Sequence, residues 1–141
     1  MERYVSIPKC VMIIDHTLPA GVIANTAAVL ALSLGKAFPE LIGHDLHDER
    51  GDRHLGITTL PVTILKSDRD GLRRLRETLK AHEAELTVID LAAATRSTRD
   101  YAAYAQALER TPLEQLDYQG IALFGASKAV NAFSGSLGLL R

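Results

Sequence analysis

Short apolar runs alternate with longer segments of helical character along the chain. Four runs rich in β-branched residues are bounded by polar, glycine or proline positions, as buried strands are; they span residues 10–14, 60–65, 86–89 and 119–124. The segments that follow them carry helix-forming residues and helical spacing of apolar positions; they span residues 20–34, 69–82, 98–110 and 128–133. This order predicts a three-layer α/β/α sandwich with a small, about four-stranded sheet of mixed or mostly parallel pairing.

The first predicted helix, residues 20–34, is small or apolar on almost every side. A helix with this pattern is expected to be buried between the sheet and a second surface. Small residues spaced along it allow close approach by another helix or by a second copy of the chain, so we expect a homodimer. Asn25, Thr26 and Ser33 interrupt the apolar stretch, which falls short of the roughly 20 residues of a membrane span, so we expect no membrane partner.

Length and composition fit one ordinary domain over residues 1–141. Apolar residues make up 47%, which excludes a disordered chain, and the formal charge of −1 gives no overall attraction for polyanions. Cys10 is the only cysteine and lies in an apolar run, so it is expected to be a core residue in a reducing compartment. Without a basic and apolar leader pattern at the N-terminus, we expect a cytoplasmic protein.

A polar, glycine-punctuated stretch over residues 42–56 holds three of the five histidines. His44, His47 and His54 are the weak candidates for metal ligands, and Asp48 lies among them. The spacing fits neither a calcium loop nor a zinc signature, so we predict no metal and no cofactor. A long connection of this kind is usually functional, a lid or disordered, and we count His44, Asp48 and His54 as ligand-binding candidates.

Polar residues follow the predicted strands where ligands bind in open α/β sheets. Asp15 and His16 end the first strand, Asp90 ends the third, and Ser127 and Lys128 follow the fourth. If the strands concerned are parallel, these residues converge at one edge. Asp15, His16 and Asp90 are therefore the catalytic candidates, suited to acid–base chemistry, and Ser127 and Lys128 are ligand-binding candidates. The alternative is that the two aspartates cap loops or helices.

The start of the first helix supplies the remaining ligand-binding candidates, Gly21, Asn25 and Thr26. Free backbone N–H groups in a first helical turn can help to bind an anion. The alternative is that Asn25 and Thr26 bond to neighbouring backbone, at a dimer interface for example.

Basic residues crowd the second predicted helix over residues 69–82. Asp70 precedes Arg74 by four residues and Arg73 precedes Glu77 by four, which predicts ordinary surface ion pairs rather than an RNA-binding face.

Several of these blocks together resemble the type II peptidyl-tRNA hydrolases. The resemblance begins with the apolar strand at residues 9–14 and the loop and alanine-rich helix at 18–28, and it resumes at residues 61–67, 86–90 and 120–125. The chain is similar to a bacterial family of unknown function placed in that superfamily. The loop at residues 43–59 and the helix at 98–110 look like insertions.

The departures from the hydrolase pattern bear on activity. The resemblance implies a lysine at the position of Val22 and a glutamine at the position of Thr26, while Asp90 matches a family aspartate. A lysine at a helix N-terminus would attract an anionic substrate or a developing oxyanion, and valine cannot.

Three functions follow as hypotheses, and the sequence leaves open whether the chain is an enzyme. The leading one is a hydrolase-like fold without hydrolase activity that binds a small molecule, with tRNA a less favoured partner. A second is a peptidyl-tRNA hydrolase-like esterase with a relocated basic residue, such as Lys66 or Lys128. A third is a metal-dependent hydrolase that uses the stretch from His44 to His54.

Overall fold

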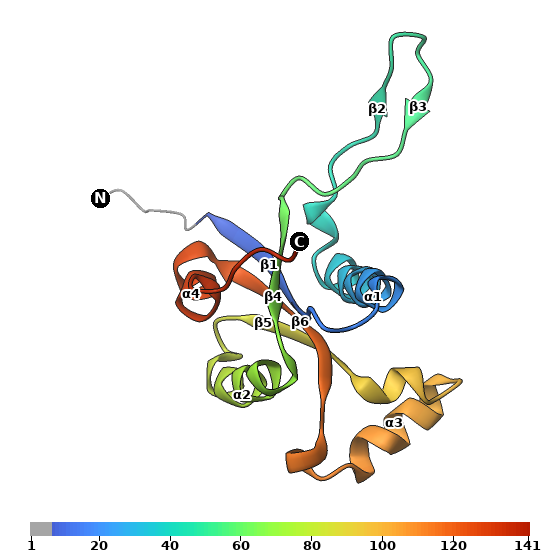
Figure 1. The fold of residues 1–141 in the computed structure, drawn as a ribbon. Helices are drawn as coiled ribbons and strands as arrows, with labels where there is room; N and C mark the ends of the chain where they lie inside the picture. Colours follow the sequence, from blue (N-terminus) through green and yellow to red (C-terminus); the bar gives the residue numbers. More distant parts are fainter. Residues whose placement is uncertain (1–6) are drawn as a thin grey trace.

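Residues 7–141, which the computed structural model describes, form a mixed α/β fold with a four-stranded sheet and four α-helices (Figure 1). The strands are β1 (Pro8–Asp15), β4 (Val62–Ser67), β5 (Thr87–Ala92) and β6 (Tyr118–Ala126). They lie in the order β4-β1-β6-β5. Strand β1 runs parallel to β4, whereas β6 runs antiparallel to both β1 and β5, so the pairing is mixed.

The centre of the sheet is apolar on both faces, as the first predicted strand requires. In β1, Val11 and Ile13 belong to one core cluster, while Met12 and Ile14 belong to the other. All four side chains are at most 1% exposed. Cys10 is also buried, and burial raises the pKa of its thiol to about 11, so it is an unreactive core residue at neutral pH.

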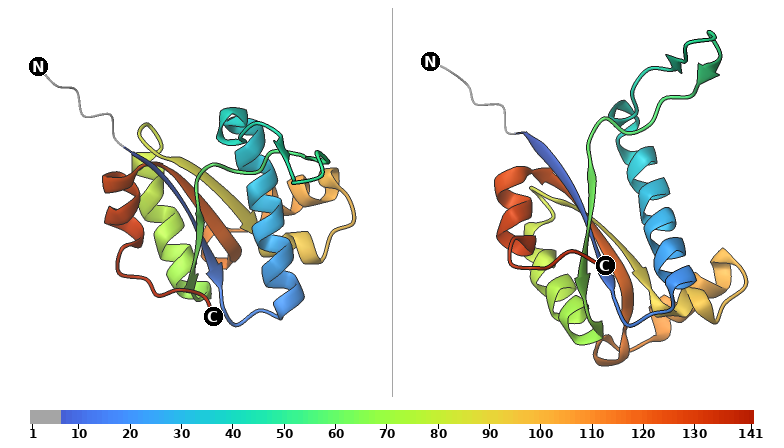
Figure 2. Two further views of the ribbon diagram at one scale, coloured as in Figure 1. Left: turned by 90° about the horizontal axis from the view of Figure 1, so that it is seen from above. Right: turned by 45° about the horizontal axis from the view of Figure 1, so that its top comes forward.

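Helices cover both faces of this sheet (Figure 2). Helix α1 (Ala20–Ala37) packs on one face, and α2 (Arg69–Leu79) and α4 (Ser127–Ser134) pack on the other. Helix α3 (Tyr101–Arg110) lies beside the end of β5, where the Tyr104 hydroxyl accepts a 2.9 Å hydrogen bond from the Ala92 N–H. The described chain also contains four short 3₁₀ helices: Pro39–Leu41, Lys80–His82, Ala93–Arg96 and Leu113–Gln115.

The predicted strands and helices are confirmed with shifted ends. The largest correction concerns Asp90, which was expected to stop its strand but lies inside β5, two residues before its end. A carboxylate is tolerated there because Arg76 of α2 donates a 2.7 Å hydrogen bond from Nε to Asp90 Oδ2. Such a tertiary partner is not visible in the local pattern of the strand.

The polar stretch after α1, residues 42–58, forms an arm that stands clear of the sheet (Figures 1 and 2). Strands β2 (Leu46–His47) and β3 (Arg53–His54) pair antiparallel, and Gly51 turns the chain between them with a φ of 84°. At the base, the hairpin is so narrow that a Cβ on Gly56 would lie 1.9 Å from the Gly43 carbonyl oxygen.

Helix α1 buries only one stripe against the sheet, formed by Thr26, Leu30 and Leu34. Its opposite side is open, and Leu32 is 77% exposed. By length and hydropathy alone this helix could cross a membrane, but it packs on the core cluster of β1. The second surface that the apolar pattern predicts is not supplied by residues 7–141.

Candidate functional site

A polar cavity of about 490 Å³ lies at one edge of the sheet. Strands β1, β4 and β5 end at this edge and β6 begins there, because β6 runs opposite to the other three. The cavity walls come from the β1–α1 turn, the start of α2, the segment after β5 and the start of β6; they comprise Asp15, Thr17, Leu18, Asp68, Arg69, Asp70, Ala93, Arg96, Asp117, Tyr118 and Gln119. The structure therefore places a cavity where the strand ends were expected to bind a ligand.

Asp15 is the buried carboxylate of this cavity, with 6% of its surface exposed. Its Oδ1 accepts hydrogen bonds from the Thr17 N–H at 2.9 Å and from the Thr17 hydroxyl at 2.7 Å. These bonds fix the turn between β1 and α1, so the capping role considered for Asp15 is present. No described residue donates to the second carboxylate oxygen, Oδ2, and Asp15 retains acceptor capacity towards the cavity.

Gln119 reaches the cavity through an irregularity in the sheet. Ala92 pairs with Tyr118 and Leu91 pairs with Gly120, so Gln119 is the extra residue of a β-bulge. Bulges often re-aim side chains beside functional sites. Here the bulge buries the Gln119 amide, only 2% exposed, between the sheet and α1.

The hydrogen bonds of Thr26 fix the orientation of that amide. The Thr26 hydroxyl donates its single proton to the Val22 carbonyl at 2.7 Å, so it can only accept from Gln119. Gln119 Nε2 donates to it at 3.0 Å. Gln119 Oε1 is then left buried, and it is one of two buried side-chain polar atoms in residues 7–141 without a hydrogen-bond partner. A buried acceptor left in this state costs about 1–3 kcal/mol.

Charged residues of both signs surround the opening. Arg69 lies 3.9 Å from Asp70 as an exposed pair, and Arg96 is exposed on the 3₁₀ helix after β5. Asp117 is neutralised by Arg73, which forms an ion pair with it. Burial, followed by nearby Asp90, raises the pKa of Tyr118, so its hydroxyl stays protonated at neutral pH.

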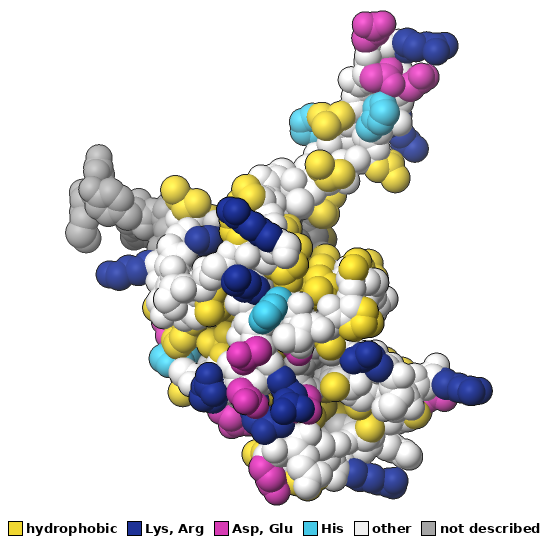
Figure 3. All heavy atoms as spheres, viewed as in Figure 1, with side chains coloured by type: hydrophobic (Ala, Val, Ile, Leu, Met, Phe, Trp, Pro, Cys, Tyr) yellow, Lys and Arg dark blue, Asp and Glu magenta, His cyan; other side chains and the backbone are white. Residues whose placement is uncertain are grey.

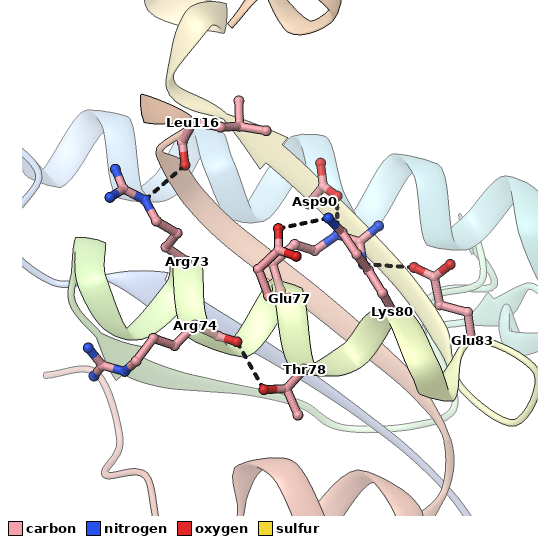
Figure 4. A network of polar contacts seen from close by, with 9 residues as sticks. Arg73, Arg74, Glu77, Thr78, Lys80, Glu83, Asp90 and Leu116 are labelled. Carbon is pink, nitrogen blue, oxygen red and sulfur yellow. Dashed lines mark hydrogen bonds and ion pairs between the residues drawn. The ribbon is translucent and has the colours of Figure 1, made fainter. Parts of the chain in front are cut away.

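Asp90 lies beside α2 (Figure 4), and neither Asp90 nor its partner Arg76 is among the residues that line the cavity. Asp90 is 22% exposed and is held by Arg76, whose Nη1 also lies 2.8 Å from Glu83 Oε1 in an ion pair without hydrogen-bond geometry. Burial lowers the pKa of Arg76, but the hydrogen bond to Asp90 and the charge attraction of Asp90 and Glu83 outweigh it, and the pKa is raised overall. The structure therefore does not bring Asp90 together with Asp15.

The remaining candidates separate into two groups. Gly21 and Asn25 are exposed on the outer side of α1, whereas Thr26 is fully buried beside Gln119. Ser127 and Lys128 lie at the opposite edge of the sheet, where the Ser127 N–H donates to the Ile7 carbonyl at 2.9 Å. The antiparallel direction of β6 takes them away from Asp15, so the convergence that depended on parallel strands does not occur.

The histidines of the arm do not form a ligand cluster. His54 Nε2 lies 2.8 Å from Asp48 Oδ2, and that contact lowers the pKa of Asp48, while His44 Nδ1 contacts the Asp45 carbonyl at 2.9 Å. All these residues and His47 are exposed. In the described part of the chain, no three His, Cys, Asp or Glu side chains are placed to hold a metal ion.

Sequence reasoning did not identify Gln119, Arg96 or Thr17 as parts of a site. The available signal was a polar residue at the head of an apolar strand, since Gln119 directly precedes Gly120 and Ile121. The bulge that turns Gln119 towards α1 depends on pairing with β5, which no local pattern encodes.

The fold and this cavity define a class: a mixed α/β fold with a buried carboxylate and a buried amide at the edge of the sheet where β1, β4 and β5 end and β6 begins. The family described as "Protein of unknown function (DUF2000)" matches residues 8–141, and the chain belongs to it. A solved structure of a protein of unknown function, Atu0240 from Agrobacterium tumefaciens strain C58, is similar, with a TM-score of 0.86 and 19% identity over 95% of this chain and 98% of that one. No curated protein matches.

Proposed function

We propose that the protein binds a small polar molecule in the strand-end cavity and lacks peptidyl-tRNA hydrolase activity. The observation that carries the proposal is at Gln119, which lines the polar cavity and whose buried Oε1 has no hydrogen-bond partner among the described residues. A ligand that presents an N–H or O–H donor would supply the missing hydrogen bond. Asp15, with its free Oδ2, favours a second donor on the same ligand, and Arg69 and Arg96 favour an anionic group near the opening.

The hydrolase and metal alternatives have less support. Helices on both faces of the sheet are in keeping with a three-layer, hydrolase-like architecture, but Val22 still offers no charge at the start of α1. Of the two lysines that could replace it, Lys128 lies at the far edge, and Lys66 lines a different cavity. The histidine arm lacks the grouping that a metal-dependent hydrolase needs.

A thermal-shift comparison tests this function. Amino acids, sugars and nucleosides, all rich in N–H and O–H donors, are compared with simple monocarboxylates that lack additional donors. We expect at least one donor-rich compound to stabilise the protein by about 2.7 kcal/mol at one hundred times its Kd, because it binds only the folded state. Stabilisation by the monocarboxylates alone would contradict the role given to Gln119 and Asp15.

We also propose that a second copy of the chain covers the arm and the outer side of α1. Ile42, Leu46, Leu55 and Ile57 of the arm are between 47% and 72% exposed, and Leu32 of α1 is 77% exposed. An isolated two-stranded hairpin is marginally stable, so the arm needs a partner.

A two-fold dimer would satisfy both surfaces at once, because each arm would lie along α1 of the other copy. One side of the arm, residues 42–48, is about 23 Å long when extended, and a helix is about 10 Å wide. Two such contacts bury a total of roughly 900 Å², just below the roughly 1,000 Å² expected of a specific interface. In this dimer the second copy covers the apolar side of α1, so that side is not available to a lipid bilayer. This arrangement fits a cytoplasmic protein.

Light scattering after size exclusion tests the dimer. We expect the mass of two chains for the native protein and of one chain for Leu32→Glu and Leu46→Glu, since each buries a charge in the interface. Leu113→Glu, at a leucine that is 58% exposed outside the arm and α1, is the matched control and should stay dimeric. A native protein with the mass of one chain would overturn the proposal.

A further inference from the structure

A second cavity, of about 410 Å³, lies on the other side of the start of α2. Three cationic or protonatable side chains from three elements line it: His16 after β1, Lys66 of β4 and Arg74 of α2. In Figure 3, Lys and Arg side chains and a histidine lie over β4 and α2, with acidic side chains among them. The backbone ties two of these segments together, since the His16 N–H donates to the Ser67 carbonyl at 3.1 Å.

These three side chains have no acidic partner within residues 7–141, unlike their neighbours. Arg73 pairs with Asp117, Arg76 pairs with Asp90, and the ion pair expected between Asp70 and Arg74 is absent because Asp70 lies beside Arg69. The one carboxylate in this cavity, Asp68, is engaged as the N-cap of α2 and accepts the Gly71 N–H at 2.7 Å. Lys66 and Arg74 therefore outweigh the single Asp68 carboxylate and leave a net positive charge in this cavity, beside a helix N-terminus.

The apolar part of the lining, here called the apolar floor, consists of Leu75, Phe133 and Leu137. Together with the cationic rim, which is formed by His16, Lys66 and Arg74, it favours a molecule with an anionic head and an apolar body. A phosphate monoester satisfies the rim best, because its dianion can accept from several donors at once, and the cavity volume suits a small organic group.

We propose that His16, Lys66 and Arg74 bind the phosphate of a small soluble phosphate monoester, whose organic part lies on Leu75, Phe133 and Leu137. This site is distinct from the strand-end cavity, because the two linings have only Asp68 in common. The proposal does not depend on the function proposed for Gln119.

Phenyl phosphate is the probe, titrated into the ¹⁵N-labelled full chain while amide shifts are followed by NMR. We expect saturable shifts at Ser67, Asp68 and Gly71, and weaker binding of both inorganic phosphate and phenol, which each lack one half of the probe. Lys66→Met and Arg74→Met should each weaken binding at least tenfold, a loss of about 1.4 kcal/mol. Lys36→Met removes an exposed charge from α1 and should bind as the native chain does.

The following results would overturn the proposed phosphate site or a part of it. No saturable shift with phenyl phosphate, or equal losses in Lys66→Met and Lys36→Met, would overturn the site. Equal affinity for inorganic phosphate would overturn the role of the apolar floor. Co-sedimentation with phosphatidic acid vesicles that is lost in Lys66→Met would assign the phosphate to a lipid headgroup and overturn the soluble ligand. Gln119→Met should retain phenyl phosphate binding, which separates this result from a failure of the strand-end cavity.

Discussion

Replacing Arg76 by methionine is expected to lower the free energy of unfolding by about 2–3 kcal/mol, below the roughly 3–5 kcal/mol of fully buried pairs because both partners retain some exposure. Arg76 is 15% exposed and Asp90 is 22% exposed at their side chains. The substitution leaves the Asp90 carboxylate between β5 and α2 without its donor, and an uncompensated buried charge is costly. Urea unfolding followed by circular dichroism measures the change.

The double variant identifies the cause of that loss. Arg76→Met combined with Asp90→Val removes both charges and places an apolar side chain in a strand, so most of the stability should return. Arg110→Met, at an exposed arginine, should change stability by less than about 0.5 kcal/mol. If the double variant is less stable than Arg76→Met alone, the pair is not the origin of the effect.

The second large effect is expected at Gly120, where α1 approaches β6 most closely. A Cβ at this position would lie 2.7 Å from Thr26 Cγ2 and 3.3 Å from both the Ile13 carbonyl oxygen and Leu30 Cδ1. Thr26 cannot turn aside, because its hydroxyl is held by the Val22 carbonyl and by Gln119. Gly120→Ala should therefore cost about 2 kcal/mol through overpacking, measured by urea unfolding.

Two further variants test whether the contact with Thr26 causes the loss of stability in Gly120→Ala. Thr26→Ser keeps the hydroxyl but removes Cγ2, so it should restore stability when combined with Gly120→Ala. Gly21→Ala is the matched control, because nothing lies within 4 Å of its Cβ on the exposed side of α1. It should stabilise the protein by about 0.5–1 kcal/mol through helix propensity. An unchanged Gly120→Ala variant would show that α1 can move away from the sheet at no cost.

The strands of the sheet and the helices could be predicted from short stretches of sequence, because apolar spacing and capping residues define them locally. The apolar run at residues 10–14 predicts a central strand whichever way its neighbours run, and β1 is such a strand. The Asp68 cap likewise predicts the start of α2, and its carboxylate accepts the Gly71 N–H as an N-cap does. Periodicity and capping act over a few residues, so the elements that they predict do not depend on how distant segments pair.

The site was predictable only in part because its assembly depends on strand direction and register. Asp15 could be placed at a ligand-binding edge from its position alone. The antiparallel course of β6 takes Ser127 and Lys128 to the other edge, and it brings Gln119 to the edge of Asp15 in their place. Tertiary pairing with Arg76 decides the role of Asp90 in the same way.

The conformation of the arm could not be predicted from its sequence for a different reason. Its polar, glycine-rich sequence predicts an irregular loop, yet the paired backbone at Gly43 and Ile57 extends it as a hairpin. The exposed leucines and isoleucines on it lack partners in residues 7–141, so the pattern reflects an interaction outside one chain if the proposed dimer holds.

In the proposed strand-end site, Gln119 serves binding rather than stability. An apolar replacement of similar size, Gln119→Met, loses the 3.0 Å bond to Thr26 but also removes the unpartnered buried Oε1. These opposing terms are each on the order of 1 kcal/mol, so the free variant should be about as stable as the native chain. Binding should instead be lost, because the ligand donor no longer finds its acceptor.

Calorimetric titration of native and Gln119→Met protein with the most stabilising donor-rich compound tests this claim most directly, with Gln106→Met on the exposed side of α3 as the control. We predict at least tenfold weaker binding to Gln119→Met, a loss of about 1.4 kcal/mol or more, and unchanged binding to Gln106→Met. Equal affinity in the native protein and Gln119→Met would contradict the account and remove Gln119 from the site.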